Sequence, residues 1–412
     1  IFMANINLAL DIESLDITGQ AIDSEGNIIL DVESKCTETT CHKCGQPATK
    51  RYGHSYPIKV RHTSILDTPV YLRIKPVRYQ CDDCDTTTTE QYDWCDKNAK
   101  VTKKLEEYIM RSLINSTIKD VSRKESLSYK TITRIVSRLI NKKVNWSEYS
   151  DLTTLGIDEI SDKKGHQDYL TIVSVKTKSD DLSVLAVLDD RSKDTVRDFF
   201  NSIPFNLKKT VKTVCSDMHD GFVYAALEVF GSQAVVIDRF HVAKLYRQPL
   251  DQLRIKEMAK LKDELEAQEY EKLKGMMWIL RKQHECLTQA DKVKLELLYQ
   301  YSPTLKVAHS YALKLTHIFN AHSNRRSAIA KINRWIKAVE KSELNCFKTF
   351  IKALKKYQPW IANYFKSRKN SGFVEGLNNK IKVTKRRCYG LFSSESFFQR
   401  LFLDFKGYEV FA

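Results

Sequence analysis

The chain has 412 residues, of which 42% are hydrophobic and 29% charged, and 67 Lys and Arg against 51 Asp and Glu give it a formal net charge of +16. This composition is typical of a folded globular protein with several domains, and it argues against a largely disordered chain. No apolar run approaches the roughly 20 residues that a membrane span needs, and the first residues lack a secretory signal, so we expect a cytoplasmic protein with no membrane partner.

Charge is unevenly distributed along the chain. The first 35 residues carry seven acidic residues and one basic residue, whereas residues 366–387 carry eight basic residues and one acidic residue, Glu375. The sequence pI is near 9.2. Such clustering indicates a polyanionic partner, most often nucleic acid. The alternative is a basic face that is simply solvated.

Residues 1–98 are predicted to form a β region. Segments 6–12 and 27–33 are apolar enough for short strands, and Thr18-Gly19 and residues 24–26 are typical of turns.

Two C-x-x-C pairs follow within this region. Cys41 and Cys44 form the first pair, Cys81 and Cys84 form the second, and the residues between them alternate like the strands of a hairpin. Each pair can turn two thiolates onto one cation, so we predict one structural Zn²⁺ held by four cysteines in a small β domain over about residues 36–98. The alternative is unpaired cysteines, and a redox centre is disfavoured because the pairs are far apart. Cys36, His42 and Cys95 are possible substitute ligands with poorer spacing.

Residues 99–145 are predicted to form a helix-turn-helix domain. Three helical segments span residues 102–140, with a break at Leu127-Ser128, and Ser128 is placed to cap the last helix. A helix in this position commonly contacts DNA with its first turns. The alternative is a plain three-helix packing module. The residues expected to contact DNA are Tyr129, Lys130, Thr133 and Arg134.

From Leu155 the pattern predicts a mixed α/β layer. Three apolar segments joined by short turns read as strands, and two further strands are separated by amphipathic helices. From about residue 240 to 365 the chain is almost entirely helical and rich in Lys. Trp335, Trp360, Tyr364 and Phe365 are expected to pack inside this helical region.

Three carboxylates carry the chemistry. Asp158 lies on the first of these strands, Asp217 ends the fourth, and Glu375 opens a basic helical stretch. Carboxylates that lie close together repel each other unless cations compensate, so the trio implies metal. Hard oxygen ligands favour two Mg²⁺ or Mn²⁺ ions, which suits phosphodiester chemistry. The alternative is that the three residues are ordinary helix caps and surface charges.

Other residues near the trio are expected to support the site. Asp238 and His241 end the fifth strand and are candidates for the shell around the metal ligands, although Asp238 could equally cap the following helix. Glu159 is expected to point to the opposite face of its strand, and His219 and Asp220 are expected to begin a helix. The residues after Glu375 expected to contact the DNA backbone are Asn379, Lys382, Lys385 and Arg386.

The order of these motifs resembles a known family. The double C-x-x-C, the helix-turn-helix, and then GIDE, CSDMHDG, VIDRFHVAK and VEGLNNKIKVTKRRCYG are similar to bacterial insertion-sequence transposases of the ISL3 type over roughly residues 41–400. The resemblance implies an RNase H-like catalytic core over 150–240 and 369–412, interrupted by an all-α insertion over 241–368. It also implies that Asp158, Asp217 and Glu375 are the metal-binding catalytic triad.

The activity implied by the resemblance is DNA transposition. Such a protein would bind the terminal inverted repeats of its element, cleave the DNA ends and join them to target DNA by hydrolysis and transesterification at two metal ions. Its partners would be double-stranded DNA and, on DNA, a homodimer or higher assembly in the bacterial nucleoid. The alternatives are a non-catalytic DNA-binding protein and a metal-dependent nuclease that cuts without joining.

Overall fold

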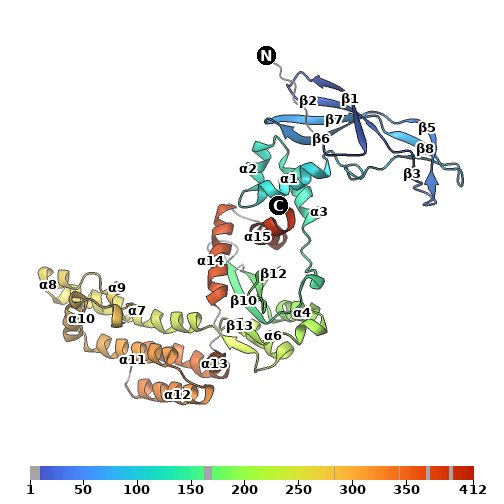
Figure 1. Cartoon of the computed structure of the whole chain (residues 1–412). Helices are drawn as coiled ribbons and strands as arrows, with labels where there is room; N and C mark the ends of the chain where they lie inside the picture. The colour runs from blue at the N-terminus through green and yellow to red at the C-terminus, as the bar shows by residue number, and fades with distance from the viewer. Residues whose placement is uncertain (1–9, 162–168, 283, 343, 368–371, 389–392) are drawn as a thin grey trace. The chain divides into compact units, whose positions relative to one another are not determined.

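The computed structural model describes residues 10–161, 169–282, 284–342, 344–367, 372–388 and 393–412, except for the side chains of His284, Ser367, Phe373, Val374, Glu375 and Asn378. The chain divides into two compact units (Figure 1). Ile1–Asn141 together with Gln399–Ala412 form one, here called the N-terminal unit, and Lys142–Phe398 form the other, here called the core unit.

The N-terminal unit begins with a four-stranded sheet in the order β1-β2-β7-β6, in which β2 and β7 are parallel and the other neighbours antiparallel. The predicted strand over 27–33 is confirmed, whereas 10–12 of the predicted strand 6–12 are not strand and 6–9 lie outside the described residues. Thr18-Gly19 is not a turn, because β1 continues through it with a bulge between Ile17 and Gly19. The strands are β1 (Leu15–Ile22), β2 (Ile28–Ser34), β6 (Ile58–Ile65) and β7 (Thr68–Ile74).

A smaller pair of sheets holds the cysteines. One pairs β3 with β4, and the other has the order β5-β8-β9. The long spacing between the two C-x-x-C pairs arises because the β6–β7 hairpin leaves this region and pairs with β2 in the larger sheet. The strands are β3 (Thr39–Thr40), β4 (Pro47–Ala48), β5 (Lys50–His54), β8 (Val77–Gln80) and β9 (Thr87–Thr89).

Three helices follow as predicted, each begun by a hydroxyl side chain. They are α1 (Lys103–Leu113), α2 (Ile118–Lys124) and α3 (Tyr129–Leu139). The Ser128 Oγ accepts a hydrogen bond from the Thr131 N–H at 3.1 Å, so the predicted cap is present. Thr102 and Thr117 cap the other two helices in the same way.

The last helix, α15 (Ser394–Phe411), supplies an unexpected part of the N-terminal unit. We expected residues 369–412 to belong to the core, but Gln399–Ala412 pack with the helical region of the N-terminal unit instead. The buried Arg400 guanidinium donates to the Ser116 carbonyl at 2.7 Å and to the Leu113 carbonyl, and it pairs with Asp404 at 2.8 Å. These bonds join α15 to the end of α1, where the Leu113 carbonyl also accepts the Ser116 N–H at 3.0 Å.

The core unit contains the expected mixed sheet, with strand order β12-β11-β10-β13-β14. The first three strands are antiparallel neighbours, whereas β10–β13 and β13–β14 are parallel. Helices α4 and α6 pack together, and their apolar side chains share one core with the sheet. The elements are β10 (Thr154–Ser161), β11 (Tyr169–Lys176), β12 (Leu182–Leu188), α4 (Lys193–Ser202), α5 (Phe205–Lys208), β13 (Thr213–Ser216), α6 (Asp220–Phe230) and β14 (Val235–Ile237).

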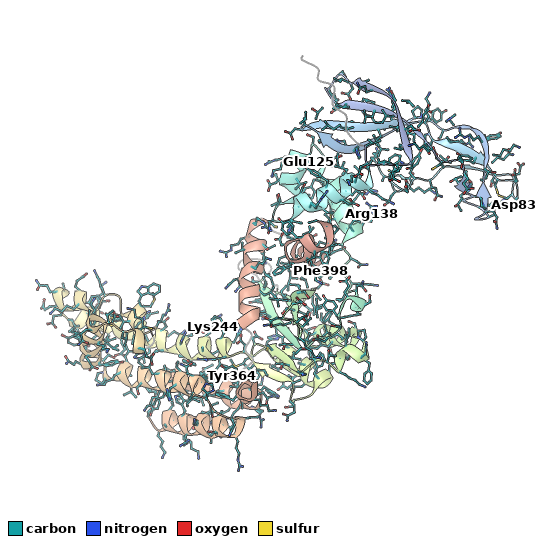
Figure 2. The ribbon with its side chains drawn as sticks, viewed as in Figure 1. Asp83, Glu125, Arg138, Lys244, Tyr364 and Phe398 are labelled. Carbon is teal, nitrogen blue, oxygen red and sulfur yellow. The ribbon has the colours of Figure 1, made fainter. Side chains whose placement is uncertain are left out.

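A helical region follows β14 and continues the same apolar core. Trp335, Tyr364 and Phe365 are buried in it and Trp360 is partly buried, as expected (Figure 2 labels Tyr364). The Asn363 side chain donates to the Val235 carbonyl at 2.8 Å, which fastens α13 to β14. The helices are α7 (Arg239–Glu264), α8 (Ala267–Lys272), α9 (Met276–Ile279), α10 (Gln289–Tyr301), α11 (Pro303–Asn320), α12 (Arg325–Lys341), α13 (Lys348–Ser367) and α14 (Gly372–Arg387), with short 3₁₀ turns at His284–Cys286 and Asn345–Phe347.

In the described part of the chain, every helix is too short or too polar to cross a bilayer.

Candidate active site and nucleic-acid interface

Asp158 on β10 and Asp217, the first residue after β13, stand at matching positions along two neighbouring parallel strands. β10 and β13 are paired in register up to Gly156 and Cys215, and each aspartate lies two residues further along its chain. Residues two apart on a strand point to the same face, and the carboxyl ends of parallel strands meet at one edge of the sheet. The strand pairing therefore places the two aspartates at one edge of the sheet.

Burial makes both carboxylates unfavourable as anions. Burial raises the pKa of Asp158, and burial together with the Asp158 and Glu159 carboxylates raises the pKa of Asp217 to about 6. Two backbone groups bond to the pair: the Glu159 N–H donates to Asp158 at 2.8 Å, and the His219 N–H donates to Asp217 at 3.1 Å. Two half-buried carboxylates that repel each other suit a divalent cation, because its charge offsets both effects and oxygen is the ligand that Mg²⁺ prefers.

Asp238 and His241 lie at the start of α7. Asp238 is buried and caps the helix by accepting the Phe240 N–H at 3.0 Å, while its other oxygen lies 3.9 Å from the His241 Nε2. After burial, the His241 imidazole is the largest influence on the pKa of both Asp158 and Asp217, and it acts to lower each. His241 therefore lies close enough to act on both carboxylates.

The neighbours of the two aspartates have structural partners. Glu159 pairs with Arg191 at 2.8 Å, and the Arg191 guanidinium also lies 4.0 Å from the centre of the Tyr169 ring. Asp220 begins α6, as expected, and accepts hydrogen bonds from Lys356 and Tyr357 at 2.6 Å each. Arg191 was not singled out from the sequence, because it lies in a loop whose position depends on partners far away in the chain.

Glu375 lies on α14, and its side chain is outside the described residues. Two features place α14 beside the carboxyl end of β10. The Lys385 ammonium donates to the Ser161 carbonyl. Burial raises the pKa of Asp158, and the positive charge of Lys382 lowers it. Glu375 precedes Lys382 by seven residues, which is about two turns along the helix.

The basic residues of α14 form a mostly exposed group. Asn379, Lys382 and Arg386 are exposed, and the Arg386 Nε donates to the Lys382 carbonyl at 3.3 Å. Lys385 is half-buried by its bond to β10. Exposed amide and basic groups of this kind can bind phosphate oxygens of a nucleic-acid backbone.

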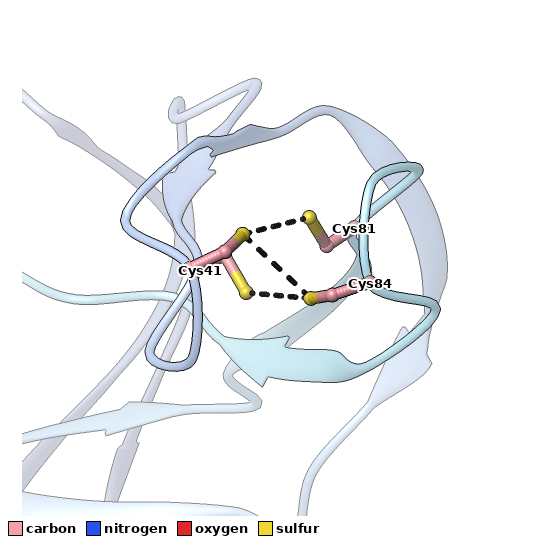
Figure 3. Close-up of side chains that lie close together, drawn as sticks. Cys41, Cys81 and Cys84 are labelled. Carbon is pink, nitrogen blue, oxygen red and sulfur yellow. Dashed lines mark hydrogen bonds between the residues drawn. The ribbon is translucent and has the colours of Figure 1, made fainter.

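The four predicted zinc ligands lie together. One ligand atom from each of Cys41, Cys44, Cys81 and Cys84 falls in a group no wider than 4.8 Å. The Sγ atoms of Cys41 and Cys84 are 3.5 Å apart (Figure 3). Those of Cys44 and Cys81 are also 3.5 Å apart. This donor set fits a tetrahedral Zn²⁺.

The local environment favours the thiolate form at one of these ligands. The Thr86 hydroxyl, followed by the backbone N–H groups of Cys44 and Lys43, lowers the pKa of the Cys41 thiol to about 5. Cys36, His42 and Cys95 lie outside the four-cysteine group. The Cys95 thiol instead faces backbone carbonyls, including that of Val101 at 3.5 Å.

The predicted recognition residues lie on the first half of α3. Tyr129, Lys130 and Arg134 are exposed, and the half-buried Thr133 donates its hydroxyl to the Tyr129 carbonyl at 2.9 Å. Arg138, further along the helix (Figure 2), is engaged differently, because it pairs with Asp96 and with the buried Glu106. The exposed first half of α3 is thus available to a partner, and its second half is tied to the rest of the unit.

Comparison with known proteins gives three family matches. Residues 37–84 match a model described as the zinc-finger of transposase IS204/IS1001/IS1096/IS1165, and residues 90–140 match the helix-turn-helix domain of transposase family ISL3. Residues 155–401, more than half of the chain, match the DDE model of the ISL3 type, described as a transposase.

Individual relatives agree with these matches. The transposase for insertion sequence element IS1001 of Bordetella parapertussis is 28% identical over 372 residues, which cover 89% of each chain. The transposase for insertion sequence element IS1557 of Mycobacterium tuberculosis is 22% identical over 304 residues, 68% of this chain and 67% of the relative.

Proposed function

This chain belongs to the ISL3 family of transposases, and from that premise we propose that it moves an insertion sequence by cleaving the DNA ends of the element and joining them to target DNA. In this proposal the zinc ribbon and the helix-turn-helix bind the terminal inverted repeats, with Tyr129, Lys130, Thr133 and Arg134 facing the DNA. The exposure of Tyr129, Lys130 and Arg134 on the first half of α3 supports this role.

The observation that carries the proposed chemistry is the pairing of β10 with β13, which sets Asp158 and Asp217 level with each other. A mixed sheet of three antiparallel strands followed by two parallel ones also supports an RNase H-like core. We assign Asp158, Asp217 and Glu375 as the ligands of two Mg²⁺ or Mn²⁺ ions. Bound there, the ions would activate the attacking hydroxyl or water and stabilise the leaving 3′ oxygen.

The remaining residues of the site position the ligands and the DNA. The two backbone N–H groups that bond to Asp158 and Asp217 hold the carboxylates in place. His241, whose Nε2 lies 3.9 Å from Asp238, would supply positive charge to the site when it is protonated. Asn379, Lys382, Lys385 and Arg386 would hold the scissile backbone along α14, on the helix that also carries Glu375.

The test is cleavage and strand transfer with DNA carrying the element's own ends. Asp158→Ala, Asp217→Ala and Glu375→Ala should each abolish Mg²⁺-dependent cleavage and joining while leaving end binding intact. Asp194→Ala removes an exposed carboxylate on α4 and should change neither. If the triad variants still cut, the site assignment is wrong.

The same assay separates the alternative functions. A wild-type protein that binds its ends but never cuts them with Mg²⁺ or Mn²⁺ would be a DNA-binding protein rather than an active transposase. Cutting without joining would indicate a nuclease.

Because two ends must be joined in concert, we also propose that the protein assembles as a homodimer or larger on DNA. Light scattering of the protein with paired end DNA should give a mass of at least two chains. A mass of one chain would contradict this assembly.

A further inference from the structure

A groove of about 680 Å³ lies between α11 and α12 of the core unit. Its apolar floor includes the buried Trp335, whose Nε1 donates to the Tyr311 carbonyl at 2.8 Å. The Tyr311 ring meets the Trp335 ring edge to face at 6.4 Å, and its hydroxyl donates to the Ala338 carbonyl at 3.0 Å. These contacts hold the Tyr311 and Trp335 rings of the groove in place.

The rim of this α11–α12 groove is basic. Lys314, His317, Lys331 and Arg334 line it, and Glu285 is the acidic residue among those lining it. The Lys314 ammonium lies 5.1 Å from the centre of the Tyr311 ring. Within the described residues, no carboxylate lies within ion-pair distance of Lys314, Lys331 or Arg334.

Other cations of the helical region do have carboxylate partners. Arg281 pairs with Asp251, Lys282 with Asp291 at 2.7 Å and Lys355 with Glu340 at 2.6 Å. Cations that gather without partners repel one another, and an anionic partner removes this repulsion. Among the described residues, the α11–α12 groove therefore brings Lys314, Lys331 and Arg334 together without a carboxylate partner for any of them.

The positive charge continues beyond the groove. Helices α12 and α13 contain six and five Lys or Arg residues, and Glu340 is their one acidic residue. Arg326, Lys337 and Lys341 are exposed on α12 and extend the charge along the helix. A basic surface of this length suits an extended polyanion better than a single small anion.

We propose that the α11–α12 groove and the exposed face of α12 bind the sugar–phosphate backbone of double-stranded DNA. Lys314, Lys331 and Arg334 would contact phosphates, and the aromatic floor would pack against deoxyribose. The inference rests on the proposed function and adds to it a further DNA contact on the core unit, separate from α3 and from α14. This contact should be independent of base sequence, because phosphates carry no sequence information.

The test compares two triple variants of the full chain that each lose three positive charges. Lys314→Ala/Lys331→Ala/Arg334→Ala removes the groove cations, and Lys256→Ala/Lys262→Ala/Lys272→Ala removes exposed lysines of α7 and α8 outside it. Fluorescence anisotropy would measure the Kd for a labelled end duplex and for a shuffled duplex at several salt concentrations. Each lost phosphate contact lowers the slope of log Kd against log salt by about 0.9. The slope of the groove variant should therefore be lower than that of the wild type by roughly 2 to 3 on both duplexes.

The control variant should keep a slope close to that of the wild type. So should the charge-conserving variant Lys314→Arg/Lys331→Arg/Arg334→Lys, which also shows whether the groove tolerates substitution. Equal slopes for the groove and control variants would overturn the inference. The inference would also be overturned if the groove variant bound DNA like the wild type but differed from it in mass by light scattering. The groove would then bind a second copy of the chain.

Failure of this inference is distinguishable from failure of the proposed function. The slopes report binding alone and need no catalysis, and Asp158→Ala should keep the wild-type slope. A wild-type protein that never cleaves DNA would overturn the proposed function while the comparison of the two triple variants still stands.

Discussion

Burial raises the pKa of Asp217, and the carboxylate of Asp158, its counterpart along the neighbouring parallel strand, raises it further. The fold therefore buries both carboxylates, and the charge of Asp158 destabilises the ionised form of Asp217. Arrangements of this kind are typical of functional sites, where stability is given up for chemistry.

Replacing one of these anions should stabilise the protein. With the pKa of Asp217 at about 6 instead of near 3.8, its ionised form weakens the fold at neutral pH, so Asp217→Asn should raise the free energy of unfolding by about 1 to 3 kcal/mol without divalent ions. The same variant should lose cleavage. Denaturant unfolding with and without Mg²⁺ measures the first effect.

The matched control is Asp220→Asn, three residues further along the chain. Its carboxylate accepts hydrogen bonds from Lys356 and Tyr357, so its loss should destabilise the protein by about 1 to 3 kcal/mol. A decrease in stability for Asp217→Asn as well would show that Asp217 is a structural residue.

The zinc ribbon should contain one metal ion per chain. Elemental analysis of purified protein should find about one zinc, and Cys44→Ser or Cys81→Ser should reduce it to near zero, because a structural site needs all four ligands. Cys36→Ser is the control, since Cys36 lies in the same unit but outside the group of four. Wild-type protein with no zinc would disprove the site.

The two ends of α3 should respond differently to mutation. Arg134→Ala removes an exposed residue and should weaken end binding by about tenfold or more without changing the melting temperature. Arg138→Ala removes the same charge from the same helix but breaks the pairs with Glu106 and Asp96, so it should lower the melting temperature. Titrations of labelled end DNA and thermal unfolding of both variants make the comparison. Equal binding by Arg134→Ala and wild type would exclude that residue from the interface.

The helical region should lose stability in mild acid through His309. This imidazole is buried on α11 beside the Tyr299 hydroxyl, at 2.7 Å, and burial lowers its pKa to about 4. Between pH 6.5 and 4 the unfolded chain binds a proton that the folded chain does not, so the free energy of unfolding falls as the pH is lowered. The full effect is about 3 kcal/mol, and it is complete below pH 4.

Urea unfolding at several pH values checks this effect. His309→Gln keeps an acceptor for Tyr299 but cannot be protonated, so its stability should fall less than that of the wild type over the same range. Parallel pH profiles would rule out His309 as the cause.

Local sequence signals predicted the structure where the deciding contacts are local. Ser128 caps α3 through an N–H three residues away, and the same short-range logic located α1 and α2. The four cysteines of the ribbon were identified because each C-x-x-C pair can turn two thiolates onto one cation. The strands of the core followed from apolar runs between polar turns.

Sequence signals failed where the deciding partner is distant. The turn expected at Thr18-Gly19 is a bulge because pairing with β2 keeps β1 extended. Lys314 and Arg334 were not singled out from the sequence, since their position on one groove depends on how α11 packs beside α12. Nothing near Arg400 indicates that it contacts the Leu113 carbonyl, 287 residues away.

That last contact makes the order of synthesis matter. At the roughly 5 to 20 residues per second of translation, α1 is made about 15 s to 1 min before the arginine that bonds to its final turn. Until then the helices that present α3 lack their contacts with α15, which carries Arg400 and Asp404. They also lack the close approach of α15 to Ile114, which Gly407 allows because it has no side chain. We therefore expect a nascent chain to bind DNA poorly until the segment bearing Glu375 has also been made.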